Sequence, residues 1–296
     1  KQWGLDEFAA KEVVQASLNL EINFFDTANV YNQGNSERVL GKALKELSNR
    51  DEIVLATKVF NPVSDKPNRA GLSRKAIFTE IDNSLERLQT DYIDLYIIHR
   101  WDYHTPIEET MRALDDLIRS GKVRYIGASA MYAWQFQQAN FVAQQNGWTQ
   151  FVSMQNHYNL LYREEEREML PYCEHAGIAV TPYSPLAAGR LTRPLNVETP
   201  RSKSDFIAQA KYDTTLETDS EIIQRLNQVA TELNTKPASL ALAWLLSKPS
   251  VVAPVVGATK RTYLEDAVAA LDLTLTPEII DYLEAPYVPH KIMGAQ

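Results

Sequence analysis

The stretch Phe24-Phe-Asp-Thr-Ala-Asn-Val-Tyr31 begins as a buried β-strand and ends in groups that can carry chemistry. Two phenylalanines are followed directly by Asp26, and the phenol of Tyr31 comes five residues after that carboxylate. Burying a carboxylate is costly unless a cation or a hydrogen-bond donor pairs with it. We therefore expect Asp26 to have a charged partner elsewhere in the chain.

Short apolar runs of this kind alternate with helix-like segments along the whole chain. The runs are apolar at nearly every position, which is typical of parallel strands covered on both faces. We predict strands at residues 22–28, 53–59, 93–99, 125–129, 151–155, 179–183 and 251–256. Helices are predicted at residues 6–19, 36–48, 73–88, 107–120, 132–146, 163–176, 219–233, 237–247 and 276–284.

Repeated strand–helix units without a break in composition predict an α/β fold with one parallel sheet. We expect a (β/α)8 TIM barrel that forms a single domain over residues 1–296, with its first strand missing from this chain. An open doubly wound sheet is the alternative, although the chain lacks the GxGxxG turn typical of dinucleotide binding in that class. The polar stretch 190–218 is expected to be a loop, and residues 286–296 a C-terminal tail.

The composition argues against several classes of partner. A formal net charge of −8 and a pI of about 5.3 disfavour binding to nucleic acids and to anionic membrane surfaces. No apolar run reaches membrane-spanning length. Cys173 is the only cysteine, so an internal disulfide is impossible, and we expect a cytoplasmic protein. The oligomeric state is left open.

Polar side chains end the first three predicted strands, namely Asp26, Lys58 and His99, and Tyr31 follows the first strand. In a barrel the carboxyl ends of the strands meet at one face, where active sites form. Taken singly, each residue has a structural explanation, such as a turn cap for the aspartate or a solvent-seeking lysine. The combination of carboxylate, ammonium, imidazole and phenol favours a catalytic site. No cluster with metal-ligand spacing competes with it, so no metal is expected.

These four side chains suit proton transfer to a substrate oxygen. A tyrosine titrates near pH ~10, and a neighbouring ammonium stabilises the phenolate. We expect Asp26 to hold Lys58 charged and in place. Tyr31 is then the general acid, and a neutral His99 orients the substrate oxygen by a hydrogen bond.

Several ordered motifs resemble those of the aldo-keto reductases, and the resemblance spans essentially the whole chain. The likeness is strongest to bacterial and fungal reductases of aryl alcohols, aryl aldehydes and related carbonyl compounds. The motifs that carry it are FFDTANVY (24–31), LATKV (55–59), YIIH (96–99), GAS (127–129), MQNHYN (154–159), PYSPL (182–186) and PVVGATK (254–260).

The resemblance implies a (β/α)8 barrel that binds NADP(H) in an extended form and reduces an aldehyde or ketone to an alcohol. Hydride would pass from the nicotinamide to the carbonyl carbon, while Tyr31 protonates the oxygen. Asp26, Tyr31, Lys58 and His99 would be the catalytic tetrad.

The same likeness assigns residues to the cofactor. A hydroxyl and an ammonium at a helix N-terminus form a good anion site, which favours NADP over NAD. The assigned residues are Ser129 and Gln155 for the carboxamide, Tyr183 for stacking on the nicotinamide, Ser184, Leu186, Gly189 and Thr192 for the pyrophosphate, Gly257, Thr259 and Lys260 for the 2′-phosphate, and Asp266 near the adenine.

The chain departs from the family pattern at three places. Ala130 and Ala267 stand where many relatives have asparagine, which implies weaker cofactor binding without a changed reaction. The family's N-terminal β-hairpin and first barrel strand are absent from this chain, which we interpret as a fragment.

The substrate is expected to be a small carbonyl compound, and Trp101, two residues after His99, is the expected wall of its pocket. Two other functions stay open. A Schiff base on Lys58 would make the protein an aldolase, but such a lysine needs a lowered pKa, which pairing with Asp26 opposes. The same fold also serves as a cofactor-binding regulatory or sensor subunit of ion channels, although the sequence offers no extra interaction segment.

Overall fold

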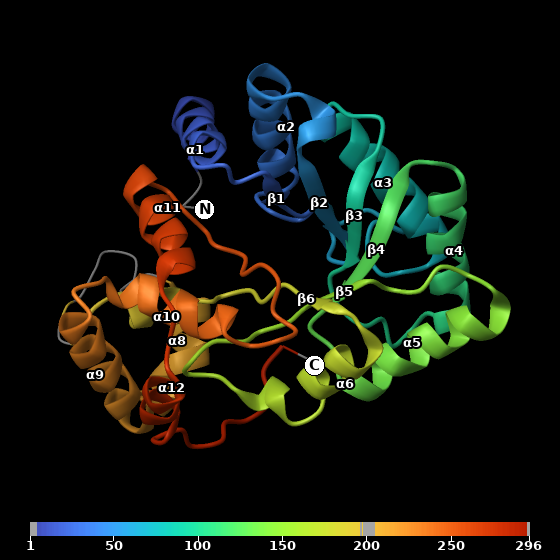
Figure 1. Ribbon diagram of the computed structural model, residues 1–296. Helices are drawn as coiled ribbons and strands as arrows, with labels where there is room; N and C mark the ends of the chain where they lie inside the picture. The colour runs from blue at the N-terminus through green and yellow to red at the C-terminus, as the bar shows by residue number, and fades with distance from the viewer. Residues whose placement is uncertain (1–4, 196, 198–204, 295–296) are drawn as a thin grey trace. The chain divides into compact units, whose positions relative to one another are not determined.

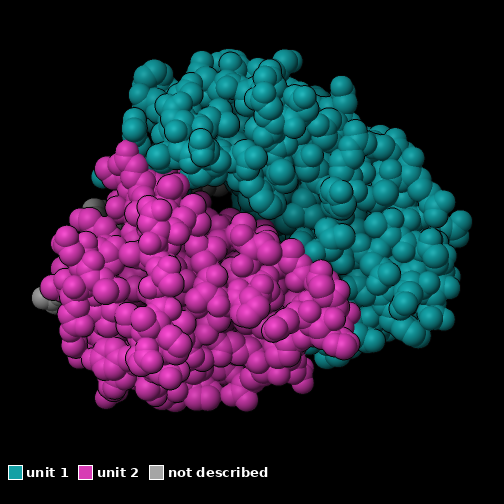
Figure 2. Space-filling model, in the orientation of Figure 1, with its two compact units in different colours: residues 1–154, 258–261, 295 teal, residues 155–257, 262–294, 296 magenta. Residues whose placement is uncertain are grey.

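The computed structural model describes residues 5–195, 197 and 205–294. Two compact units divide the chain, and each is described by itself (Figure 2). Unit 1 holds residues 1–154, 258–261 and 295, and unit 2 holds residues 155–257, 262–294 and 296. The single domain over residues 1–296 stays a prediction.

Unit 1 alternates helices and strands in the predicted order (Figure 1). The short strand β5 crosses the boundary between the units. The elements are α1 (Glu7–Asn19), β1 (Phe24–Asp26), α2 (Asn35–Leu47), η1 (Arg50–Glu52), β2 (Val54–Val59), α3 (Arg74–Leu88), β3 (Ile93–Ile98), α4 (Ile107–Arg119), β4 (Val123–Ser129), α5 (Ala133–Asn146) and β5 (Ser153–Gln155).

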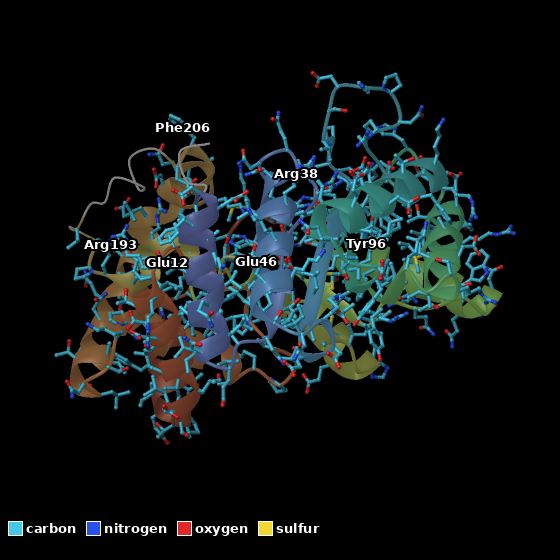
Figure 3. The ribbon with its side chains drawn as sticks, turned by 90° about the horizontal axis from the view of Figure 1, so that it is seen from above. Glu12, Arg38, Glu46, Tyr96, Arg193 and Phe206 are labelled. Carbon is cyan, nitrogen blue, oxygen red and sulfur yellow. The ribbon has the colours of Figure 1, made fainter. Side chains whose placement is uncertain are left out.

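The strands β1 to β4 pair in parallel and in chain order, and the order of the sheet continues with β5 and β6. Tyr96 on β3 is fully buried in unit 1 (Figure 3). Asp26 is in register with Ala56, two residues before Lys58 on β2. Because side chains alternate along a strand, Asp26 and Lys58 point to the same side of the sheet.

On the outer side of unit 1, α1 and α2 lie side by side (Figures 1 and 3). Two ion pairs join these helices, from Lys11 to Glu46 and from Lys42 to Glu7. All four side chains are well exposed, so these pairs add little stability.

The predicted helix boundaries are confirmed where their signals are strong. The hydroxyl of Ser73 accepts a hydrogen bond from the amide of Ala76 and caps the start of α3. Gly121 directly follows the C-cap residue of α4 and has a φ of 78°, a left-handed conformation that favours glycine.

Unit 2 is mostly helical. It holds one two-residue strand of the sheet, and its helix α11 begins at the last residue of a unit 1 segment. Its elements are η2 (Glu164–Glu166), α6 (Met169–Ala176), β6 (Ala179–Val180), η3 (Ala187–Thr192), α8 (Phe206–Tyr212), η4 (Asp213–Thr215), α9 (Leu216–Glu232), α10 (Pro237–Leu246), α11 (Arg261–Val268), η5 (Ala269–Asp272) and α12 (Pro277–Glu284).

The strand predicted at residues 251–256 is wrong. Val251 forms a single bridge with Val180, and the amides of Val252 and Val255 donate to the carbonyls of Val180 and Pro182. Pro254 has no amide hydrogen to continue the ladder, so no strand forms there.

Two further predictions differ in detail. The helix predicted at 163–176 is divided into η2 and α6. The predicted loop 190–218 contains α8, η4 and the start of α9, while residues 196 and 198–204 of it lie outside the described residues. Within the described ranges, no helix is long and apolar enough to cross a bilayer.

Candidate active site

The expected partner of Asp26 is Lys58. The Lys58 side chain is fully buried, and its ammonium donates hydrogen bonds to Asp26 Oδ1 and, at 2.8 Å, to the carbonyl of Thr27. Because the ammonium has a carboxylate and a carbonyl as acceptors, this arrangement supports a charged lysine in the core. The stretch of residues 24–31 therefore contributes Asp26 to a buried ion pair with Lys58.

Tyr31 lies in the turn between β1 and α2, above this pair. Its backbone is held on both sides, since its amide donates to Ala28 and its carbonyl accepts from Ser36. The Lys58 ammonium lies 5.3 Å from the centroid of the Tyr31 ring. The side chain is 41% exposed, so the phenol is accessible to a substrate while the lysine beside it is not.

The turn that carries Tyr31 requires a glycine at its end. Asn32, Gln33 and Gly34 all have positive φ, and that of Gly34 is 84°. A Cβ atom at Gly34 would lie 2.8 Å from Cδ of Arg87, so the buried Arg87 side chain would have to shift. Both the left-handed backbone and the packing therefore select glycine there.

His99 is the third polar group at this edge of the sheet. Its ring meets that of Tyr31 edge-on, with centroids 5.7 Å apart. Burial, followed by the positive charges of Lys58 and Arg100, lowers the pKa of His99 to about 3. The imidazole is therefore neutral at physiological pH.

Asn61 determines which nitrogen of this neutral ring carries the proton. Its side-chain amide lies 3.3 Å from His99 Nδ1, and the NH2 group is a donor. Nδ1 then accepts, so Nε2 carries the hydrogen and can donate to a substrate oxygen. Asn61 was not among the predicted site residues; its only local signal is its position three residues after Lys58.

Ser129 also belongs to unit 1. It is the last residue of β4 and is buried. The next residue, Ala130, has a φ of 47°, in the left-handed region that asparagine tolerates better than alanine. The departure at Ala130 therefore coincides with a strained backbone.

Unit 2 holds most of the other residues assigned to the cofactor. Gln155 ends β5 and is buried, while Tyr183 follows β6 and is half-buried. The Tyr183 ring lies nearly parallel to that of His157, with centroids 5.3 Å apart and a 13° angle. The Lys211 ammonium lies 4.8 Å from the Tyr183 ring centroid.

The segment predicted to line a pyrophosphate has an unusual backbone. Ser184, Ala187, Ala188 and Gly189 all have positive φ. Left-handed residues close together orient backbone amides into concavities that bind anions. Leu186 is half-buried directly before η3, and the hydroxyl of Thr192 donates to the carbonyl of Gly189.

The residues assigned to the adenosine half fall in both units. In unit 1, Thr259, Lys260 and Arg261 line a cavity of about 670 Å³ together with side chains of α1. In unit 2, Gly257 is exposed, and the carbonyl of Asp266 on α11 accepts a hydrogen bond from Ser239. The cavity has the size of a small-molecule site.

Trp101 is half-buried and has an aromatic neighbour that the sequence analysis missed. Its ring centroid lies 6.1 Å from that of Trp134 on α5, which is 56% exposed. Beside them, Gln135 donates a hydrogen bond to the phenol oxygen of Tyr103. This side of unit 1 thus offers accessible aromatic surface.

Taken together, a parallel α/β sheet ends in a buried ion pair, an accessible phenol and a neutral imidazole. These groups define a site for acid–base chemistry at an oxygen. Comparison with known proteins agrees with this class, since the profile of the Aldo/keto reductase family matches residues 1–287.

Fungal relatives match nearly the whole chain. It is 42% identical to versiconal hemiacetal acetate reductase of Aspergillus parasiticus, over 98% of this chain and 90% of that protein. It is 44% identical to a putative aryl-alcohol dehydrogenase of Schizosaccharomyces pombe, over 99% of this chain and 90% of that protein. A putative aryl-alcohol dehydrogenase of Saccharomyces cerevisiae is 43% identical over 90% of this chain and 83% of its own length.

The chain therefore belongs to the Aldo/keto reductase family. It has the α/β barrel fold of that family and is an oxidoreductase that reduces carbonyl compounds to alcohols. Nothing in these matches supports the aldolase or the regulatory-subunit alternative.

Proposed function

We propose that this protein reduces aldehydes or ketones with NADPH and that Tyr31 is the proton donor. The observation that carries the proposal is the buried Lys58–Asp26 pair beside the accessible phenol of Tyr31 and the neutral ring of His99. The reduced nicotinamide, when bound, supplies hydride to the carbonyl carbon.

Each residue of this chain then has one task. The Lys58 ammonium lies next to Tyr31 and stabilises negative charge on the phenolate as its proton leaves. Asp26 keeps the ammonium charged and in place. His99 donates from Nε2 to the substrate oxygen, where negative charge develops as hydride arrives.

The residues present fit a nicotinamide dinucleotide. Tyr183 offers a half-buried ring for stacking, and the left-handed residues Ser184 and 187–189 suit a pyrophosphate. The buried ends of β4 and β5, Ser129 and Gln155, supply hydrogen-bonding groups for the carboxamide.

A 2′-phosphate, and thus NADP rather than NAD, is supported by Thr259, Lys260 and Arg261 at the start of α11. A hydroxyl and two cations at a helix N-terminus attract a dianion. Gly257 and Asp266 flank this segment in sequence, and we propose that they too contact the adenosine half of the cofactor.

An aryl carbonyl substrate is supported by the aromatic pair Trp101 and Trp134 and by the names of the aryl-alcohol dehydrogenase relatives. We also propose a cytoplasmic location, since Cys173 is the only cysteine and its buried thiol is free.

The test is a fluorescence titration with NADPH and NADH, followed by NADPH oxidation with 4-nitrobenzaldehyde. We expect tighter binding of NADPH and turnover of the aldehyde. Tyr31→Phe should lower kcat by about 10³-fold or more while NADPH binding changes less than about twofold, because only the proton donor is lost. A variant that keeps most of its kcat would show that Tyr31 is not the donor.

A further inference from the structure

His157 forms the centre of a buried column of rings in unit 2. It is 1% exposed and stacks with two rings: that of Tyr162, with centroids 4.3 Å apart at 14°, and that of Tyr183, with centroids 5.3 Å apart at 13°. Both neighbours are thus nearly parallel to the imidazole. The column ends at Tyr183, the half-buried ring on which the nicotinamide is proposed to stack.

The edge of the imidazole is also held. Nε2 of His157 lies 2.7 Å from the hydroxyl of Tyr212 on α8. The side-chain amide of Asn159 donates to the same hydroxyl at 3.1 Å and to the carbonyl of Ser184 at 3.0 Å. The rotation of the imidazole about its own axis is therefore fixed by a hydrogen bond, as well as by packing.

Plain packing does not account for a histidine at this position. Burial, followed by the positive charge of Lys211, lowers the pKa of His157 well below its ordinary range, so the ring is neutral. Its Nδ1 atom is buried and has no partner among the described residues. Burying an unpaired ring nitrogen is costly, and a phenylalanine would fill the same space without that cost. An apolar ring, however, could not make the bond to Tyr212 that sets the plane.

We propose that His157 is a positioning residue for the cofactor, which fixes the plane of Tyr183 and thereby the plane of the nicotinamide stacked on it. The proposal rests on the proposed function, since it requires the nicotinamide to lie on Tyr183. The half-buried Tyr183 ring has the Lys211 ammonium 4.8 Å from its centroid and His157 packed nearly parallel to it, so the imidazole is one of the groups that orient this ring. Small errors in the position of a reacting carbon cost large factors in rate.

The first experiment compares two ligands by titration, NADPH and 2′,5′-ADP, which carries the adenosine half and the 2′-phosphate but no nicotinamide. We expect His157→Ala to weaken NADPH by about 3–10-fold, the range of an aromatic pair. Its affinity for 2′,5′-ADP should stay within about twofold of the wild type, because that ligand does not reach Tyr183. Equal loss for both ligands would overturn the proposal.

A second variant separates the ring from its hydrogen bond. His157→Phe keeps a ring against Tyr183 and should retain most of the NADPH affinity. It loses the bond to Tyr212, so the nicotinamide is less well oriented. We expect a lower kcat at nearly unchanged KM, with a larger isotope effect when NADPH carries deuterium at the transferred position. If thermal unfolding shows that His157→Ala is not folded, His157→Phe takes its place in the test. A His157→Phe enzyme with wild-type kcat and isotope effect would overturn the role of the Tyr212 bond.

A double-variant cycle with Tyr183→Leu tests whether the effect passes through Tyr183. Without the Tyr183 ring, His157→Ala should cause no further loss of NADPH affinity. A full additional loss would mean that His157 acts on packing in general, and the proposal would be wrong. If the wild-type protein bound 2′,5′-ADP as tightly as NADPH, stacking of the nicotinamide on Tyr183 would add no affinity. This inference would then be wrong, while the proposed function would stand. Wild-type protein that binds neither ligand would reject the proposed function and this inference with it.

Discussion

At the scale of single residues, the site depends on two neighbouring basic side chains that differ in charge. Lys58 is buried with a carboxylate partner, whereas His99, within reach of the same charge, is neutral. The physical difference is the partner: Lys58 has Asp26, and His99 has the amide of Asn61. Burial, and after it the charges of Lys58 and Arg100, therefore keep the pKa of His99 low, so that its imidazole is a neutral hydrogen-bond donor.

Asn61→Asp should change this balance. A carboxylate next to Nδ1 favours the charged imidazole, so the pKa of His99 should rise from about 3 towards neutrality. Activity would then vary with pH between about 5 and 7 as the imidazolium forms, whereas the wild type stays flat with respect to this group. The measurement is kcat/KM against pH, with ¹⁵N NMR of the imidazole.

Asn61→Leu is the control, since it removes the amide without adding charge. It should lower kcat by about 3–30-fold through loss of tautomer control, with no new pH dependence. A pH profile of Asn61→Asp that superimposes on the wild type would contradict the assigned hydrogen bond.

Lys260 gives a second prediction at this scale. Lys260→Ala should weaken NADPH by about tenfold or more and NADH by less than about twofold, because only NADPH has the 2′-phosphate. Lys11, which lines the same cavity and forms an ion pair with Glu46, is the matched control. If titrations showed equal losses of affinity for NADPH and NADH, Lys260 would not bind the 2′-phosphate.

At the scale of elements, a buried ionic network ties the turn that bears Tyr31 to the helices behind it. Glu37 on α2 accepts from Arg87 on α3 and from Thr57 on β2, each at 2.5 Å. Glu80 on α3 accepts from Asn29, two residues before Tyr31, at 3.1 Å. Glu37, Glu80 and Arg87 are buried, and Glu80 also pairs with the partly exposed Arg69 at 2.7 Å.

Arg87→Met should destabilise the protein by about 3–5 kcal/mol, because it leaves Glu37 buried without its cation. Urea unfolding measures this loss. Arg74→Met removes an exposed arginine from the same helix and should cost less than about 1 kcal/mol. If the two variants lost equal stability, the buried network would not be the stabilising feature.

At the scale of the whole molecule, stability should fall on acidification below pH 6.5. His99 and His157 stay neutral in the folded state because their pKa values are lowered, while the unfolded chain binds protons at both. The unfolded state therefore gains protons as the pH falls, at about 1.4 kcal/mol per pH unit for each group. Glu165 opposes this trend, since its pKa is raised to about 7 by burial and its folded carboxyl is protonated first.

Two variants should move this dependence in opposite directions. His99→Gln removes one acid-sensitive group and flattens the fall in unfolding free energy from pH 7 to pH 5. Glu165→Gln removes the opposing carboxyl and steepens it. The measurement is urea unfolding at three pH values, and parallel curves for all three proteins would refute the assigned pKa shifts.

The α/β class and the positions of six strands follow from the sequence alone, which also predicts the four polar groups proposed for the site. Short apolar runs that end in a charge are a local signal, and the carboxyl ends of parallel strands necessarily meet at one edge. The folded structure shows that residues 251–256, a run that contains Pro254, are not a strand. It alone reveals the contacts of Asn61 and His157. Their partners lie 38 and 55 positions away along the chain, so no periodicity or motif specifies these contacts. These contacts form because folding brings Asn61 against the ring of His99, and Tyr212 against the ring of His157, where hydrogen bonds fix the orientation of each imidazole.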